Sequence, residues 1–333
     1  MARLIVTCGV DAPGAGRQLA EAAAGEGWRT SLIVAEAVEP RGRTGPWGVV
    51  LRVGFAAIGA TVPSPAWSNL ATSRDADVLD EVADALACED VDLVVLDAGD
   101  HRAARGLIGH ARSVRALLSS AIGPQVAHAS AAEPDGAFAL LTAAVDRAAQ
   151  QERMLTDETT VWRVVTASEP ASTRRAARTL AALAVLGARV DDVLLDRYPR
   201  KDFPARDRRR AAGARALLED EIEMRTRRLR ASGAVARAGE SVRSTRPGQP
   251  VLTCAAPVET EGRWAWRIDL PRSARPDRVG VDAGHLVVEV DGCRRWLDLP
   301  AVLRRTVALD AVRDSSGLIV RFEPDPASWP GGR

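Results

Sequence analysis

Apolar residues follow two different spacings in the first part of the chain. Short apolar runs, typical of buried strands, occur at 4–7, 31–35, 91–97, 162–166 and 190–195. Between these runs, apolar residues recur at helical spacing at 18–24, 77–86 and 170–186. Because the predicted strands alternate with helices, we expect an α/β fold with a doubly wound, mostly parallel sheet.

The spacing changes in the last third of the chain. Strand-like runs separated by Gly, Pro and Asp occur at 264–270, 278–282, 285–290, 293–297, 306–309 and 317–322. Turn signals at this spacing predict a small all-β sandwich, and we expect Trp264, Trp266 and Trp296 to fill its core, unless one of them faces a partner. An arginine-rich helix is predicted over 204–230.

These changes of composition predict the domain organisation. We assign 1–238 to the α/β domain and 263–325 to the β-sandwich. The segment 239–262, rich in Gly, Ser, Pro and Arg, is predicted to be a linker, and 326–333 an irregular tail.

Composition excludes several classes of protein. The chain is 46% apolar with a net charge of +1, which gives no global reason to bind nucleic acid or a membrane. No apolar run approaches the roughly 20 residues of a membrane span, and the five-residue apolar strand near the first residue is too short for a signal peptide. The four cysteines are widely separated, so we expect neither disulfides nor a metal site, and a cytoplasmic protein. Acidic residues interrupt the arginine-rich helix, which favours a solvated face over an RNA-binding one.

The segment 9–18 has the layout of a phosphate-binding loop, with a strand before it, glycines within it and a helix after it. The motif ends in Gly-Lys-Ser/Thr, whereas this loop ends in Gly16-Arg17-Gln18, and Lys201 is the only lysine of the chain. Arginine is bulkier than lysine, and glutamine cannot replace the hydroxyl that binds Mg²⁺. The residues therefore predict a loop that has kept its frame and lost its hydrolytic groups.

Four segments in the same order resemble the ArsA-type family of P-loop ATPases, which includes the arsenite-pump and tail-anchored-protein-targeting ATPases. They are 11–18, 93–99, 164–170 and 193–197. The sandwich resembles the α-crystallin (small heat-shock) fold that ends some bacterial ArsA-like proteins, through the segments 286–292, 297–300, 317–320 and 322–326. The resemblance implies a vestigial nucleotide site at Gly14, Gly16, Arg17, Gln18, Asp97 and Asp196.

The departures from that family fall on its functional positions. Ala12 stands where the family has a lysine that crosses the dimer, and 36–40 lacks the family's switch motif. Arg17, Gln18 and Asp196 replace the hydrolytic lysine, the Mg²⁺ hydroxyl and the adenine-side asparagine. We expect no catalytic residue and no cofactor, with weak ATP or ADP binding left open. The resemblance implies a dimer, formed with itself or with an intact paralogue.

Three functions stay open from the sequence. The first is a pseudo-ATPase that serves as a scaffold, regulatory or chaperone-like subunit. The second is a weak ATPase that uses Arg17. The third is an adaptor that binds a partner or a protein client through the sandwich.

Other residues give little sign of catalysis or of client binding. Asp97 is interpreted as a helix cap or turn residue. No nucleophile accompanies the four histidines, His101, His110, His128 and His285, and the last two are expected on the surface or in loops. With only three methionines, the chain gives weak support for binding apolar helices.

Overall fold

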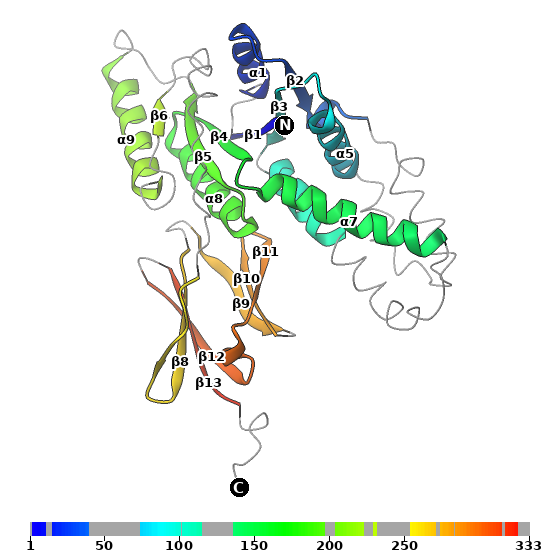
Figure 1. Ribbon diagram of the computed structural model, residues 1–333. Helices are drawn as coiled ribbons and strands as arrows, with labels where there is room; N and C mark the ends of the chain where they lie inside the picture. The colour runs from blue at the N-terminus through cyan, green and yellow to red at the C-terminus, as the bar shows by residue number, and fades with distance from the viewer. Residues whose placement is uncertain are drawn as a thin grey trace. The chain divides into compact units, whose positions relative to one another are not determined.

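A computed structural model of the chain (Figure 1) describes residues 2–10, 15–39, 74–100, 102–114, 136–196, 204–222, 229–231, 254–270, 274–282, 284–314 and 317–325. These residues form two compact units, one ending at Val161 and the other beginning at Trp162. Parallel strands with helices, followed by small antiparallel sheets, confirm the predicted α/β fold with a C-terminal β-sandwich. Within these ranges, no helix has the length and apolarity needed to cross a bilayer.

Three parallel strands form the centre of the first unit, in the order β2-β3-β1. β3 (Leu93–Asp100) pairs with β1 (Arg3–Val10) on one side and β2 (Thr30–Val34) on the other. Residues 93–98 are all buried, as expected for a central strand. The described helices of this unit are α1 (Ala15–Gly25), η1 (Ala35–Ala37), α5 (Arg74–Ala87), residues 102–114 and α7 (Gly136–Thr156).

Helix α1 covers the strands with one apolar stripe. Leu19 and Ala23 are buried against Ile5 and Val95. The other side of the helix is exposed to solvent at Arg17, Gln18, Glu21 and Ala24. This division between a buried and an exposed side is typical of a helix that packs against a single layer.

The second unit begins with three more parallel strands, in the order β4-β5-β6. They are β4 (Val161–Ala167), β5 (Val190–Asp196) and β6 (Leu229–Ala231). Helix α8 (Pro170–Leu186) connects β4 to β5, and α9 (Ala205–Ile222) follows β5. The predicted bounds of α8 are confirmed, because Pro170 begins the helix and Gly187 ends it at φ 82°, in the left-handed region.

Two antiparallel sheets form the sandwich. One has the order β11-β10-β9 and the other β12-β13-β8-β7. The strands are β7 (Val258–Thr260), β8 (Arg263–Ile268), β9 (Pro276–Asp282), β10 (His285–Val290), β11 (Cys293–Asp298), β12 (Thr306–Arg313) and β13 (Leu318–Pro324), with the short helix η5 (Ala301–Leu303) between β11 and β12. Trp266 and Phe322 are buried between the sheets.

Helix α8 contributes to the core of the sandwich. Ala181 and Val185 belong to the same buried cluster as Trp266, Val288 and Phe322. The side chain of Arg295 on β11 donates a hydrogen bond to the carbonyl of Val185, at 3.3 Å. Strands β10 and β11 lie beside the helix in Figure 1, as these contacts require. The sandwich and the helix therefore share one apolar interior.

The structure corrects several sequence-based boundaries. The helix predicted over 204–230 ends at Ile222, and Leu229–Ala231 is instead the strand β6, paired with β5. The predicted linker 239–262 includes β7, which pairs with β8. Helix α7 and the helix at 102–114 were not predicted, although the buried residues Ala104, Leu107, Ile108 and Ala111 of the second helix follow helical spacing. The predicted tail 326–333 lies outside the described residues.

The tryptophan prediction was correct only in part. Trp266 is 3% exposed, and Trp264 packs partly buried against the same core. Trp296 is 48% exposed, so its predicted place in the core is wrong. It lies on β11 next to His285, with the two rings 6.0 Å apart and nearly perpendicular. Alternation along the strand explains the difference, because Arg295 and Leu297 take the inward positions.

Candidate functional site

The best candidate site is the N-terminal end of α1, where the chain resembles a phosphate-binding loop. β1 ends at Val10 and α1 begins at Ala15, so the predicted strand and helix flank the loop. Residues 11–14, which include the predicted site residue Gly14, lie outside the described residues. Gly16 is buried, whereas Arg17 and Gln18 are exposed.

Asp97 occupies the place next to Gly16 at this helix end. Its Oδ2 accepts a hydrogen bond from the backbone N–H of Gly16, at 3.2 Å, and its Oδ1 accepts one from Gly99 at 3.2 Å. The first N–H groups of a helix have no partner within the helix and attract anions. Asp97 satisfies one of them from a neighbouring strand, so its interpretation as a capping residue is confirmed.

The contact between Asp97 and the helix depends on glycine. A Cβ added to Gly16 would lie 2.5 Å from the Asp97 Cβ and 2.9 Å from its carboxyl carbon. The Asp97 Cβ is bonded directly to the backbone of β3 and cannot rotate away. Gly16 therefore serves close packing between α1 and β3, a role that needs no bound phosphate.

Other acidic groups surround this end of the strands. Asp100 caps the helix at 102–114 by accepting hydrogen bonds from the N–H groups of Arg102 and Ala103, at 2.8 and 2.9 Å. Glu36 lies beside Gly99, which has φ +74°. Burial, with the nearby charges of Asp97 and Asp100, raises the pKa of the Cys8 thiol to about 12. Cys8 is therefore a neutral, buried thiol, and the described groups around it are acidic.

The remaining predicted site residue is Asp196, the last residue of β5. It belongs to the second compact unit, and its side chain lies outside what the structure describes. The structure therefore brings Gly16 and Asp97 together. Arg17 and Gln18 lie in the first turn of the same helix, and neither side chain is buried.

The histidines are not arranged as an acid–base pair. His110 is buried in the helix at 102–114, and burial lowers its pKa to about 4, so it is neutral at pH 7. His285 lies on β10, where its Nε2 is 3.0 Å from the Oδ1 of Asp298 on the neighbouring strand β11. His101 and His128 lie outside the described residues. In the described ranges, no three His, Cys, Asp or Glu side chains are grouped to hold a metal ion.

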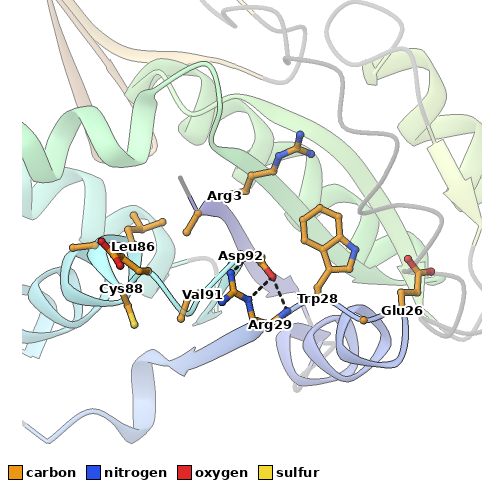
Figure 2. A pocket seen from close by; sticks show the side chains of 12 residues that line it. Arg3, Glu26, Trp28, Arg29, Leu86, Cys88, Val91 and Asp92 are labelled. Carbon is orange, nitrogen blue, oxygen red and sulfur yellow. Dashed lines mark hydrogen bonds and ion pairs between the residues drawn. The ribbon is translucent and has the colours of Figure 1, made fainter.

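A second feature, not predicted from the sequence, is an open hollow of about 520 Å³ at the amino ends of the strands of the first unit (Figure 2). Arg29 pairs with both carboxylate oxygens of Asp92, at 2.8 and 3.0 Å. These hydrogen bonds lower the pKa of Asp92 to about 2. The guanidinium of Arg3 lies 5.9 Å from the ring centre of Trp28. Since Arg29 and Asp92 directly precede the paired residues Thr30 and Leu93, the register of β2 and β3 explains their meeting.

Charged side chains line the hollow, but two of them, Arg29 and Asp92, already form an ion pair with each other. Figure 2 shows the Arg29 and Asp92 side chains directed at one another. Arg29 also lies 3.5 Å from Asp90. The hollow therefore offers a ligand little uncompensated charge from this pair, and it lies at the opposite strand ends from Gly16 and Asp97.

A third polar group is buried between α5 and α7. Asp80 is fully buried and accepts hydrogen bonds from Arg147 and Gln151, both at 2.7 Å. Burial raises the pKa of Asp80, and Arg147 opposes that shift. Arg112 and Glu152 form a further ion pair at 2.8 Å. The sequence signal was a charged residue on the apolar side of α5, but its partners on α7 could not be identified without the fold. These contacts link the helices of the first unit.

No protein-family model matches the chain. Among curated proteins it is similar to the uncharacterized protein SCO2128 of Streptomyces coelicolor, with 32% identity over 300 residues. The matched region covers 81% of this chain and 74% of the Streptomyces protein.

Proposed function

Because the chain belongs to the same family as the uncharacterized protein SCO2128 of Streptomyces coelicolor, whose name gives no activity, we propose a function from its own residues. The protein is an ArsA-like pseudo-ATPase: a scaffold or regulatory subunit that keeps the frame of a nucleotide-binding domain and does not hydrolyse ATP. It dimerises, with itself or with an intact paralogue.

The contact between Asp97 and Gly16 carries this proposal. In a phosphate-binding loop, the N–H groups at the start of the helix bind the anion. Here the carboxylate of Asp97 accepts the Gly16 N–H, at 3.2 Å. A phosphate placed there would have to displace a side chain of the protein itself and then lie beside its negative charge.

The neighbouring groups support the same function. The described acidic residues Asp97, Asp100 and Glu36 gather at this end of the strands, and their charges repel a polyphosphate. Arg17 is the described cation nearest in sequence, and it is exposed. Gln18 supplies no hydroxyl for Mg²⁺. The groups that would stabilise a transferring phosphoryl group are therefore missing at these positions.

Titration of the purified full chain with ATP and with ADP, with and without Mg²⁺, tests the proposal. We expect no heat of binding by calorimetry and no shift in melting temperature. Asp97→Asn is the informative variant, because it removes the charge and keeps the shape of the side chain. We expect it to gain affinity for sulfate or ATP, since the helix end then lacks its internal anion.

Two results would contradict the pseudo-ATPase. Micromolar binding of ATP that requires Mg²⁺ would show that the loop still works. Turnover of ATP that disappears in Arg17→Ala would favour the alternative in which Arg17 replaces the lysine. A protein that stays a nucleotide-free monomer, both alone and when mixed with an intact paralogue, would contradict the subunit role.

A second candidate function, binding of a protein client by the sandwich, is favoured by exposed apolar residues on β12. Val307, Leu309 and Val312 are 40%, 44% and 41% exposed on this edge strand. Edge strands with apolar side chains pair readily with other chains. The test is suppression of the aggregation of reduced insulin by the full chain, compared with Leu309→Lys. Equal suppression by both proteins would exclude β12 as the client site. The full chain is needed because α8 contributes to the sandwich core.

A further inference from the structure

The outer face of the three-stranded sheet carries an ordered pattern of charge. We call outer face the side of β9, β10 and β11 opposite to the buried residues Leu286, Val288 and Val290. Strand register places nine residues on it in three rows. The basic row is Arg278, Glu289 and Arg294; the middle row is Gly280, Val287 and Trp296; the acidic row is Asp282, His285 and Asp298.

The two outer rows carry opposite charge. The basic row contains two arginines and one glutamate, and the acidic row contains two aspartates and a histidine. Within each row a neighbouring pair is already in contact: Arg294 lies 2.9 Å from Glu289, and His285 lies 3.0 Å from Asp298. The arginines and aspartates at the ends of the rows are exposed. The face therefore changes from positive to negative along the strand direction.

The middle row is apolar and open at both ends. Trp296 is 48% exposed, and Val287 beside it is 8% exposed. A Cβ added to Gly280 would meet no atom within 4 Å, so that end of the row is uncovered. A half-exposed tryptophan and a glycine on either side of Val287 leave a shallow apolar strip between the two charged rows.

We propose that the outer face binds the same face of a second copy of this chain, across a two-fold axis that runs along the middle row. This axis lies perpendicular to the strands. It places Arg278 opposite Asp282 of the second copy and Arg294 opposite its Asp298, while Trp296 meets Trp296. Glu289 lies opposite His285. Every charged group of one basic row then faces a complementary group of the other acidic row.

The strand register also disfavours a dimer whose two-fold axis runs parallel to the strands. A two-fold axis parallel to the strands would place Arg278 opposite Arg294, Asp282 opposite Asp298, and Glu289 opposite Glu289. Like charges would face each other in both charged rows, and their repulsion disfavours that pairing. The pattern thus selects one orientation for the pair. This inference does not rest on the state of the glycine loop, so the two proposals can fail separately.

The size of the face indicates a weak dimer. Three strands about 4.8 Å apart, with same-side residues roughly 6.8 Å apart along each strand, give roughly 300 Å² per copy. A standard stable interface buries about 800 Å² per partner. We therefore expect a dimer that forms at micromolar or higher concentration and dissociates as salt screens its charge pairs.

Sedimentation velocity of the full chain over a range of concentrations tests the inference. We expect a concentration-dependent dimer at low salt, weakened at high salt. Two double variants then test whether the outer face, and not another surface, forms the dimer interface. Asp282→Arg with Asp298→Arg makes both charged rows basic, and Arg278→Asp with Arg294→Asp makes both acidic. Each variant alone should lose at least about 100-fold in dimer affinity, because like charges now face each other.

The decisive measurement is sedimentation velocity on a mixture of the two variants. A basic face and an acidic face fit each other, so an equimolar mixture should form a heterodimer that neither variant forms alone. Glu158→Arg with Glu259→Arg is the matched control: it makes the same change in net charge as the basic variant, at exposed positions outside the outer face, and should leave the dimer intact. Trp296→Ala should also weaken the dimer, and thermal melts show that each variant is folded.

Three outcomes overturn the inference. The first is a wild-type chain that stays monomeric at low salt. The second is a dimer that both row variants preserve, which would place the interface elsewhere. The third is a mixture of the variants that shows no heterodimer although both are folded.

Discussion

Helices α1 and α8 follow parallel strands in the two compact units, yet they are buried differently. α1 is buried on one side, at Leu19 and Ala23, and is exposed at Ala24. α8 keeps an exposed side at Arg174, Arg175 and Arg178, but it is buried on all sides over 179–186, where Ala181 and Val185 enter the sandwich core. α8 buries no ionisable side chain, whereas two other helices of the first unit do: α5 buries Asp80, and the helix at 102–114 buries His110.

This difference shows how the sandwich is integrated into the protein. A sandwich attached only by a linker would leave the second half of α8 with an exposed side, as α1 has. Instead, Arg295 hydrogen-bonds to the Val185 carbonyl near the helix end, and the apolar cluster is continuous from helix to sheets. The sandwich therefore gains stability from the α/β part of its unit, and it cannot be assumed to fold alone.

The same substitution in the two helices gives the largest expected difference. Ala181→Glu places a charge in the shared core, and we expect it to lower the free energy of unfolding by about 4–5 kcal/mol. Ala24→Glu is the matched control at an exposed position of α1, with an expected effect within about 0.5 kcal/mol. Urea unfolding followed by circular dichroism measures both. Equal, small effects would mean that α8 and the sandwich do not share a core.

The buried histidine gives a smaller, pH-dependent effect in the first unit. The pKa of His110 is lowered to about 4, so the folded state favours its neutral form. Its contribution to stability is complete above the unfolded pKa of about 6.5 and is lost as the pH falls from there to about 4, by roughly 3 kcal/mol in total.

The comparison that isolates this effect is wild type against His110→Gln, by unfolding at a series of pH values. As the pH falls from 6.5 to 4, the free energy of unfolding of the wild type should decrease relative to that of the variant. The raised pKa of Asp80 acts in the opposite direction, since the fold favours its neutral form. It is present in both proteins and cancels. A difference that is constant with pH would show that His110 is accessible to water.

Two glycines of α1 give the smallest predicted effect. A Cβ on Gly16 would lie 2.5 Å from the Asp97 Cβ, whereas one on Gly25 would meet no atom within 4 Å. We expect Gly16→Ala to destabilise the protein by about 2 kcal/mol through overpacking. Gly25→Ala should be neutral or stabilise it by up to about 1 kcal/mol. Melting temperatures of the two variants measure the contrast, and equal shifts would argue against the close packing of Asp97 on α1.

Prediction from the sequence worked best where a local rule is strong. The bounds of α8 follow from Pro170 at its start and Gly187 after its end, and the apolar run before Asp97 identified β3. Prediction from the sequence failed where a tertiary contact decides the conformation. Leu229 lies in an arginine-rich segment with helical propensity, but it pairs with β5 as a strand. Trp296 is apolar enough for a core, but strand alternation places it outside.

The candidate site divides in the same way. The sequence by itself determined that the glycine loop and the first turn of α1 lack the lysine and the hydroxyl of a working phosphate site, because these depend on residue identity alone. Only the tertiary structure decided what replaces them: the carboxylate of Asp97, brought from a strand far along the chain to the Gly16 N–H. The rows of the outer face likewise exist only in the pairing of three strands. Hydrogen bonding between distant segments sets both arrangements, and no local pattern of residues encodes it.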